Sequence, residues 1–216
     1  EVLRFLEAAD PETAAVARER YGCLTPWQKD PAAYGRAALT GSYRSCEPDV
    51  LGMLPDLLGN RMAPLRVEDE TFFDAVQNAR LVADAEAYYR IMYYGAAQSW
   101  NHRDQHMFQT LRQLLEFRGP RSKAVVWEHN SHVGDATATE MSARGELNIG
   151  QLCRQQFGDA AYSIGFGTDH GTVAAASHWD GAMERKRVRP SHPESYEHLC
   201  HASGVERFLL PLRSPA

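Results

Sequence analysis

The sequence lacks an excess of positive charge, a long apolar run and an N-terminal signal-peptide pattern. Its formal net charge is −5 at pH 7 and its pI is about 6.0, so it has no basic footprint typical of nucleic-acid-binding proteins. No apolar stretch approaches the roughly 20 residues that a membrane-spanning helix needs. We therefore predict a cytoplasmic protein that acts on a small molecule, with neither nucleic acid nor membrane as a partner.

Cysteine is scarce and is not spaced for cross-linking or for zinc binding. No two of the cysteines form a Cys-x-x-Cys pair, which argues against a zinc knuckle and against a disulfide framework. We expect reduced thiols, as in a cytoplasmic protein. The four cysteines are Cys23, Cys46, Cys153 and Cys200.

The length suits one sizeable core. With 216 residues and 44% hydrophobic content, and without an internal repeat, the chain predicts a single domain over residues 1–216. It begins at Glu1 without a methionine, so we expect it to be part of a longer domain. Residues 1–70 are predicted to be a helical or irregular lead-in, and residues 71–216 to carry the sheet and the site.

Hydrophobic spacing predicts a helix-rich N-terminal half. In residues 1–22 the helical pattern breaks and restarts at Asp10-Pro11, because proline suits a first helical turn. The other predicted helices span residues 47–58, 71–95, 101–117 and 193–203, a further one begins at Glu146 or Asn148 and ends at Phe157, and residues 61–69 are predicted to be irregular.

The helix predicted at residues 101–117 places charge on an apolar face. Winding it at about 100° per residue puts Arg103 and Asp104 beside Trp100 and the leucines. Asn101 would cap the start of this helix, and the negative charge of Asp104 in the first turn would stabilise it. Arg103 reaches either into a site or into a separate salt bridge. His102 and His106 fall on the polar side, where we expect exposure to solvent.

Apolar runs followed by polar side chains predict strands that end in a site. Residues 124–127 indicate a strand buried on both faces, and acid, base and amide side chains follow it at once. Residues 161–167 end in the same way, with Asp169 and His170. Further strands are predicted at residues 172–177, 183–188 and 207–212, the first two forming a possible pair. The polar residues after the first strand are Glu128, His129, Asn130, Ser131, His132 and Asp135.

The motif Trp127-Glu-His-Asn-Ser-His-Val-Gly-Asp135 closely resembles Trp-Ala-His-Asn-x-His-Val of the erythromycin esterase family. Residues 100–107, 141–150 and 162–167 extend this resemblance in the right order, so that it covers residues 70–210. Glu128 departs from it, since alanine is the commoner choice there. The family's Gly-Glu-x-x-His-Gly segment, which holds a water-activating histidine, is absent from the chain.

The resemblance implies an α/β fold with a mainly parallel central sheet flanked by helices. It also implies water-mediated cleavage of a carboxylic ester or macrolactone, as in macrolide resistance, with no cofactor and no metal. We expect catalytic roles for His129 and His132 as acid–base groups, together with Arg103, Asp104 and Asp135. The expected substrate-binding residues are Trp100, Asn130, Glu128 and His170.

Two other functions stay open at the level of sequence. Glu128, His129 and His132 offer one carboxylate and two imidazoles, an allowed zinc set to which His170 could add a third ring. That set would make the protein a metal-dependent hydrolase. Alternatively, the domain binds its ligand without catalysis.

Overall fold

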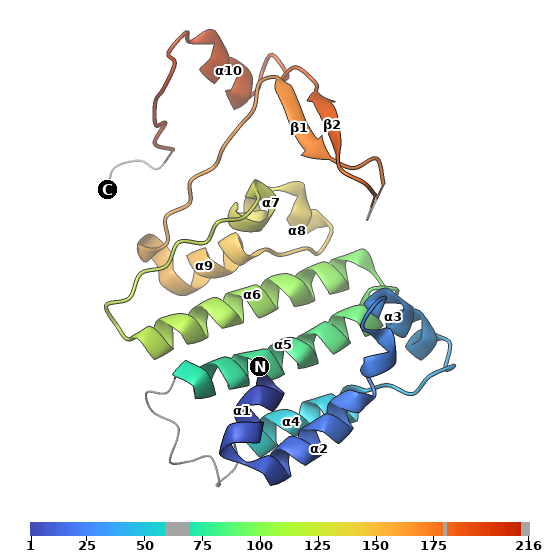
Figure 1. Cartoon of the computed structure of the whole chain (residues 1–216). Helices are drawn as coiled ribbons and strands as arrows, with labels where there is room; N and C mark the ends of the chain where they lie inside the picture. The colour runs from blue at the N-terminus through green and yellow to red at the C-terminus, as the bar shows by residue number, and fades with distance from the viewer. Residues whose placement is uncertain (59–69, 179–180, 213–216) are drawn as a thin grey trace. The chain divides into compact units, whose positions relative to one another are not determined.

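The computed structural model describes residues 1–58, 70–178 and 181–212. The chain divides into two compact units, Glu1–Ser163 and Ile164–Ala216 (Figure 1). The irregular segment predicted at residues 61–69 lies outside the described residues. None of the described helices combines the length and the apolar character that crossing a lipid bilayer requires.

The first unit is helical throughout its described secondary structure. The long antiparallel helices α5 and α6 lie side by side in it (Figure 1). Its helices are α1 (Val2–Ala9), α2 (Pro11–Gly22), α3 (Pro31–Leu39), α4 (Glu47–Leu58), α5 (Glu70–Ile91), α6 (Ala96–Arg118), α7 (Asn130–Val133), α8 (Glu140–Ala143) and α9 (Ile149–Phe157), with short 3₁₀ turns at Thr25–Trp27, Ala136–Ala138 and Gly158–Ala160.

Two Asp-Pro pairs start helices in the lead-in. Asp10 accepts a hydrogen bond from the Thr13 amide at 3.2 Å and caps α2, whose first residue is a proline. Asp30 caps α3 in the same way through the amide of Ala33 at 3.0 Å. The aspartate satisfies an amide that has no helical partner, and the proline has the backbone angle of a first turn. The restart predicted at Asp10-Pro11 is confirmed.

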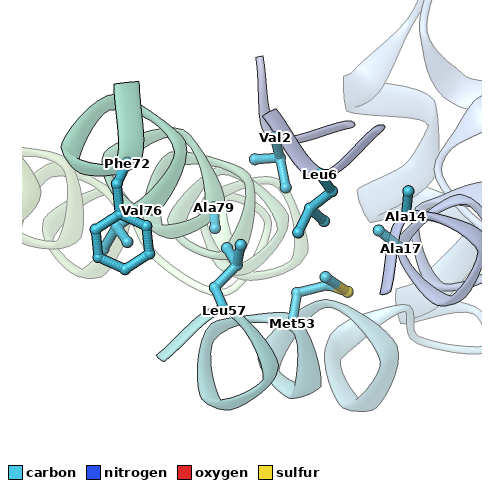
Figure 2. Packing of buried hydrophobic residues seen from close by; sticks show 9 residues of the cluster. All are labelled: Val2, Leu6, Ala14, Ala17, Met53, Leu57, Phe72, Val76 and Ala79. Atoms are coloured by element: carbon cyan, nitrogen blue, oxygen red, sulfur yellow. The ribbon is translucent and has the colours of Figure 1, made fainter. Parts of the chain in front are cut away.

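The main core lies where α1, α2, α4 and α5 meet (Figure 2). Met53 and Leu57 of α4 are fully buried and point toward α5 and α1. Leu6 of α1 closes the cluster, while small alanines let α2 approach closely. Removing a buried leucine side chain from such a cluster costs about 2–5 kcal/mol. The clustered residues are Val2, Leu6, Ala14, Ala17, Met53, Leu57, Phe72, Val76 and Ala79.

A buried carboxylate joins α3 to α5 beside this core. Glu86 accepts hydrogen bonds from the Tyr34 hydroxyl and from Arg90 Nε, the latter at 3.1 Å. The Tyr34 hydroxyl in turn accepts from the Cys46 amide at 2.9 Å. Burial, followed by the contact with Glu86, raises the pKa of Tyr34. The Glu86 charge is therefore compensated inside the fold rather than by water.

A disulfide joins Cys23 and Cys46, whose Cα atoms are 5.9 Å apart. The prediction of four reduced thiols is wrong for this pair, although Cys153 and Cys200 are free. The two residues lie at the end of α2 and just before α4, and these helices pack together. Packing brings the thiols within reach, and the linear spacing of the cysteines does not reveal it.

The mainly parallel sheet predicted from the resemblance is wrong for the described residues. They contain two strands, β1 (Gly171–Ala175) and β2 (Glu184–Val188), which pair antiparallel. Residues 124–127, predicted to be a buried strand, are outside any sheet, and Val125 and Trp127 are 88% and 86% exposed. Strand formation needs a neighbouring strand to accept the backbone hydrogen bonds, and an apolar run alone does not supply one. Residues 161–167 and 207–212 are likewise outside any sheet.

The second unit contains this hairpin and α10 (Tyr196–Ala202). The predicted pairing of residues 172–177 with 183–188 is confirmed, with Gly171 opposite Val188 and Ala175 opposite Glu184. The helix predicted at residues 193–203 is confirmed as α10. None of the described residues of this unit is buried, so it has no apolar core of its own among them.

A close helix contact gives a test of this packing. A Cβ atom on Gly35 of α3 would lie 1.9 Å from the carbonyl oxygen of Tyr89 in α5. Gly35→Ala must therefore push the two helices apart, and we expect it to lower the free energy of unfolding by about 1–3 kcal/mol. Urea denaturation followed by circular dichroism measures the change.

Gly22→Ala is the matched control, because its Cβ would meet nothing within 4 Å. It lies at the end of α2, and we expect no loss of stability and a gain of up to about 1 kcal/mol. Equal stabilities of the two variants would contradict the close α3–α5 contact.

Candidate functional site

The candidate site is built on one face of α6. Trp100, Arg103 and Asp104 are three and four residues apart, so they share a face. That face meets α9, and α7 packs against the start of α9. All the contacts of the site described below lie within the first unit.

Asp104 is fully buried, and its carboxylate has donors from two other segments. His132 Nδ1 lies 3.0 Å from each carboxylate oxygen. The amide of Ile149, the first residue of α9, donates to Oδ2 at 3.0 Å. A buried charge is tolerated only when its hydrogen bonds are satisfied, and a helix N-terminus adds favourable partial charge. The carboxylate therefore holds α7 and α9 against α6.

The prediction that Asn101 and Asp104 stabilise the start of the helix is wrong. α6 begins at Ala96, five residues before Asn101, so Asp104 lies beyond the first turn. Asn101 does not cap the helix. Its side chain accepts from the Leu147 amide and donates to the Gly145 carbonyl, both at 2.8 Å.

The His132 ring is fixed on two sides. It stacks on the indole of Trp100, with ring centroids 4.5 Å apart and planes 9° apart. Trp100 Nε1 donates to the Leu147 carbonyl at 2.7 Å, which fixes the indole in turn. With Nδ1 donating to Asp104, the neutral imidazole carries its lone pair on Nε2. The ring is held in one orientation and one tautomer.

Arg103 lies at the free edge of this imidazole. Its guanidinium carbon is 5.0 Å from the centroid of the Trp100 ring, a cation–π contact. One guanidinium nitrogen is 3.5 Å from His132 Nε2, at the outer limit of a hydrogen bond. Of the two readings left open by the sequence, the structure places Arg103 in the cluster with His132.

A second group of contacts positions α7. Asn148 is buried, caps α9 through the Gln151 amide at 2.9 Å, and donates to the Ser131 carbonyl at 2.9 Å. A Cβ on Gly150 would lie 2.1 Å from the Gly134 carbonyl oxygen, so only glycine allows this approach of α9 to α7. Asn148 was predicted as a possible helix start, and its link to α7 was missed.

Glu128 approaches the cluster without a hydrogen bond at one oxygen. Its side chain is 24% exposed, and Oε2 lies 3.9 Å from His132 Nδ1. That oxygen is buried and has no hydrogen-bond partner. Burial raises the pKa of Glu128 and the Asp104 charge adds to the rise, while His132 and Arg103 oppose it. Glu128 therefore keeps its proton to a higher pH than an exposed glutamate.

The other expected site residues make different contacts. His129 is exposed, and its Nδ1 accepts from the Ser131 amide at 3.2 Å and caps α7. Asp135 caps the next 3₁₀ turn through the Thr137 amide and pairs with Arg154 at 3.1 Å, so an arginine and not a histidine pairs with this carboxylate. Asn130 is the first residue of α7 and is exposed. His170 belongs to the second unit, beside Asp169.

The metal set suggested by the sequence does not form in the first unit. Among the described residues, Glu128, His129 and His132 are not part of a group whose ligand atoms converge on one point.

The prediction that His102 and His106 are exposed to solvent is wrong. Both approach Asp84 of α5, His106 Nδ1 at 2.7 Å from its carboxylate and His102 Nε2 at 3.0 Å from its carbonyl. They join α5 to α6.

A comparison with protein-family models agrees with the resemblance found in the motifs. No solved structure matches the chain. A family model described as erythromycin esterase matches residues 1–216, the whole of the chain. The protein therefore belongs to the erythromycin esterase family.

Proposed function

We propose that this protein hydrolyses a carboxylic ester or macrolactone, with His132 as the group that moves the proton. The observation that carries the proposal is the Asp104–His132 pair. A buried carboxylate holds Nδ1, and the opposite nitrogen of the ring faces a guanidinium. Membership of the erythromycin esterase family supports the reaction class.

Each residue of the cluster has a step for which its chemistry is suited. His132 Nε2 takes a proton from the attacking water, and Asp104 orients the ring and stabilises the imidazolium that forms. Arg103 stabilises the negative charge that develops on the carbonyl oxygen of the substrate. Trp100 keeps the imidazole and the guanidinium in place through its two stacking contacts.

Glu128 is suited to a different step. Ester cleavage leaves an alkoxide that needs a proton, and burial raises the pKa of Glu128, so its carboxyl group keeps a proton to a higher pH than an exposed glutamate does. Its Oε2 lies 3.9 Å from His132 Nδ1, so this carboxyl group lies beside the proposed base. We propose Glu128 as the acid and His132 as the base.

Three of the residues expected to be catalytic or substrate-binding have secondary roles in this proposal. His129 and Asp135 cap short helices next to His132, and Asn130 begins the helix that carries it. We propose that they position α7. A macrolide lactone remains the proposed substrate class, because the name of the family points to it.

His132→Ala tests the central role. We expect kcat/KM for erythromycin or an aryl ester to fall by about 100-fold or more, the loss expected for an acid–base group. KM should change less than kcat, because the ring acts on the reacting atoms. Steady-state hydrolysis assays of the full chain measure both constants.

His192→Ala is the control, since His192 lies in the second unit and bonds the nearby Glu194 amide. Unchanged turnover in His132→Ala would remove His132 from the mechanism. Binding of erythromycin by the wild-type chain without any hydrolysis would favour the non-catalytic function instead.

Glu128→Gln tests the raised pKa through stability. A carboxyl group whose pKa is higher in the folded state costs stability once pH rises above its unfolded value of about 4.3. The amide has no such cost, so the variant should gain melting temperature over wild type at pH 7 and lose this advantage below about pH 4.

Thermal melts at several pH values measure the difference, with Glu140→Gln as the control because Glu140 is exposed. A difference between Glu128→Gln and wild type that stays the same from pH 4 to pH 8 would contradict the raised pKa.

A further inference from the structure

Three histidines surround one carboxylate in the second unit. Asp169 Oδ2 lies 2.5 Å from His170 Nδ1 and 3.8 Å from His201 Nε2, and Asp169 Oδ1 lies 3.9 Å from His198 Nδ1. Asp169, His170 and His201 each present a ligand atom within 4.8 Å of the other two. None of these residues belongs to the cluster around His132. His170 was expected from the sequence to bind substrate, but it lies in the second unit.

The hairpin and the short helix bring these residues together. Gly171 pairs with Val188, so residues 169 and 170, just before β1, lie beside the chain that leaves β2. The Ser191 amide donates to the Asp169 carbonyl at 2.8 Å and continues this approach. In α10, His198 and His201 are three residues apart and share a face. Both of these rings approach Asp169.

A hydrogen bond from Ser191 fixes the orientation of the Asp169 carboxylate. Ser191 Oγ donates to Asp169 Oδ1, which leaves Oδ2 toward His170 and His201. A hydrogen-bonded carboxylate with a fixed orientation is the usual arrangement at metal sites.

A simple pair of His170 with Asp169 would explain why the His170 ring lies beside the carboxylate. It does not account for His201, whose ring lies 5.1 Å from that of His170 in a T-shaped arrangement. Donor atoms around a tetrahedral ion with bonds of about 2.0–2.1 Å are about 3.3 Å apart. The separations of 2.5 Å and 3.8 Å fall on either side of that value, so small side-chain rotations suffice.

A bound metal would also stabilise the second unit. None of its described residues is buried, and large apolar side chains such as Leu199 and Phe208 are exposed. A bound metal stabilises a small unit that has few buried contacts, because its binding free energy adds to the free energy of folding. An ion on these residues would join α10 to the base of the hairpin.

We propose that Asp169, His170 and His201 bind a divalent transition-metal ion, zinc being the best match. Two imidazoles and one carboxylate are a common zinc set, and they leave one position for water or for His198. Ser191 is a positioning residue that holds the carboxylate. His170 is 61% and His201 58% exposed at the side chain, so the ion can enter from solvent.

Isothermal titration of the metal-free full chain with ZnCl₂ tests the proposal. We expect one Zn²⁺ per chain in the wild type. His201→Ala should weaken binding by more than about 100-fold, and Ser191→Ala by about 10–100-fold, the range for a residue that orients a ligand. His178→Ala is the matched control, an exposed histidine of the same unit outside the group, and should bind as the wild type does.

The absence of stoichiometric Zn²⁺ binding by the wild type would overturn the proposal. Equal losses in His201→Ala and His178→Ala would do the same, because they would show nonspecific binding to surface histidines. If His201→Ala does not fold, Co²⁺ titration of the wild-type chain decides: visible absorption bands of a low-symmetry, four-coordinate site support the proposal, and the spectrum of hydrated Co²⁺ contradicts it. Ester hydrolysis is not the readout, so failure here leaves the role of His132 unaffected.

Discussion

The carboxylate of Asp104 has no exposure to solvent, and its charge is compensated by donors from α7 and α9. This requirement organises the site. The hydrogen bonds to Asp104 come from His132 of the short helix α7 and from the first amide of α9. Both segments must therefore lie on the same face of α6. Asn101, Asn148 and Gly150 make that approach possible through side-chain hydrogen bonds and the absence of a Cβ. The free edge of His132 then lies at a defined place beside Arg103.

The same constraint explains why the helical part of the fold matters for chemistry. α6 is anchored to α5 by Asp84 with its two histidines, and α5 is anchored to the lead-in by the core of Figure 2 and by Glu86. A rigid α6 fixes Trp100, Arg103 and Asp104 relative to one another. Precision of this kind is what acid–base and electrostatic catalysis require. Glu128 adds a buried carboxyl oxygen that the packing leaves without a hydrogen bond.

Local patterns predicted the elements that depend on neighbouring residues in the sequence. The two long helices and the Asp10-Pro11 restart follow from helical periodicity and from the preference of proline for a first helical turn, and the β1–β2 hairpin follows from two short strand-like runs. The sheet did not follow, because residues 124–127 need a paired strand that an apolar run cannot supply. The Cys23–Cys46 disulfide depends on how α2 packs on α4. For the site, the residue types Arg103, Asp104 and His132 could be picked out. Which carboxylate orients which histidine could not, since Asp104 lies 28 positions from His132 in the chain.

The proposed role of His132 requires one tautomer of its ring. ¹⁵N NMR of the histidine rings, assigned by comparison with His132→Ala, observes it directly. We expect His132 to carry its proton on Nδ1, with a strongly downfield N–H signal that moves upfield in Asp104→Asn, where a neutral amide replaces the carboxylate. A His132 ring protonated on Nε2, or one that exchanges rapidly between the two tautomers in the wild type, would contradict the Asp104–His132 pair as the basis of the site.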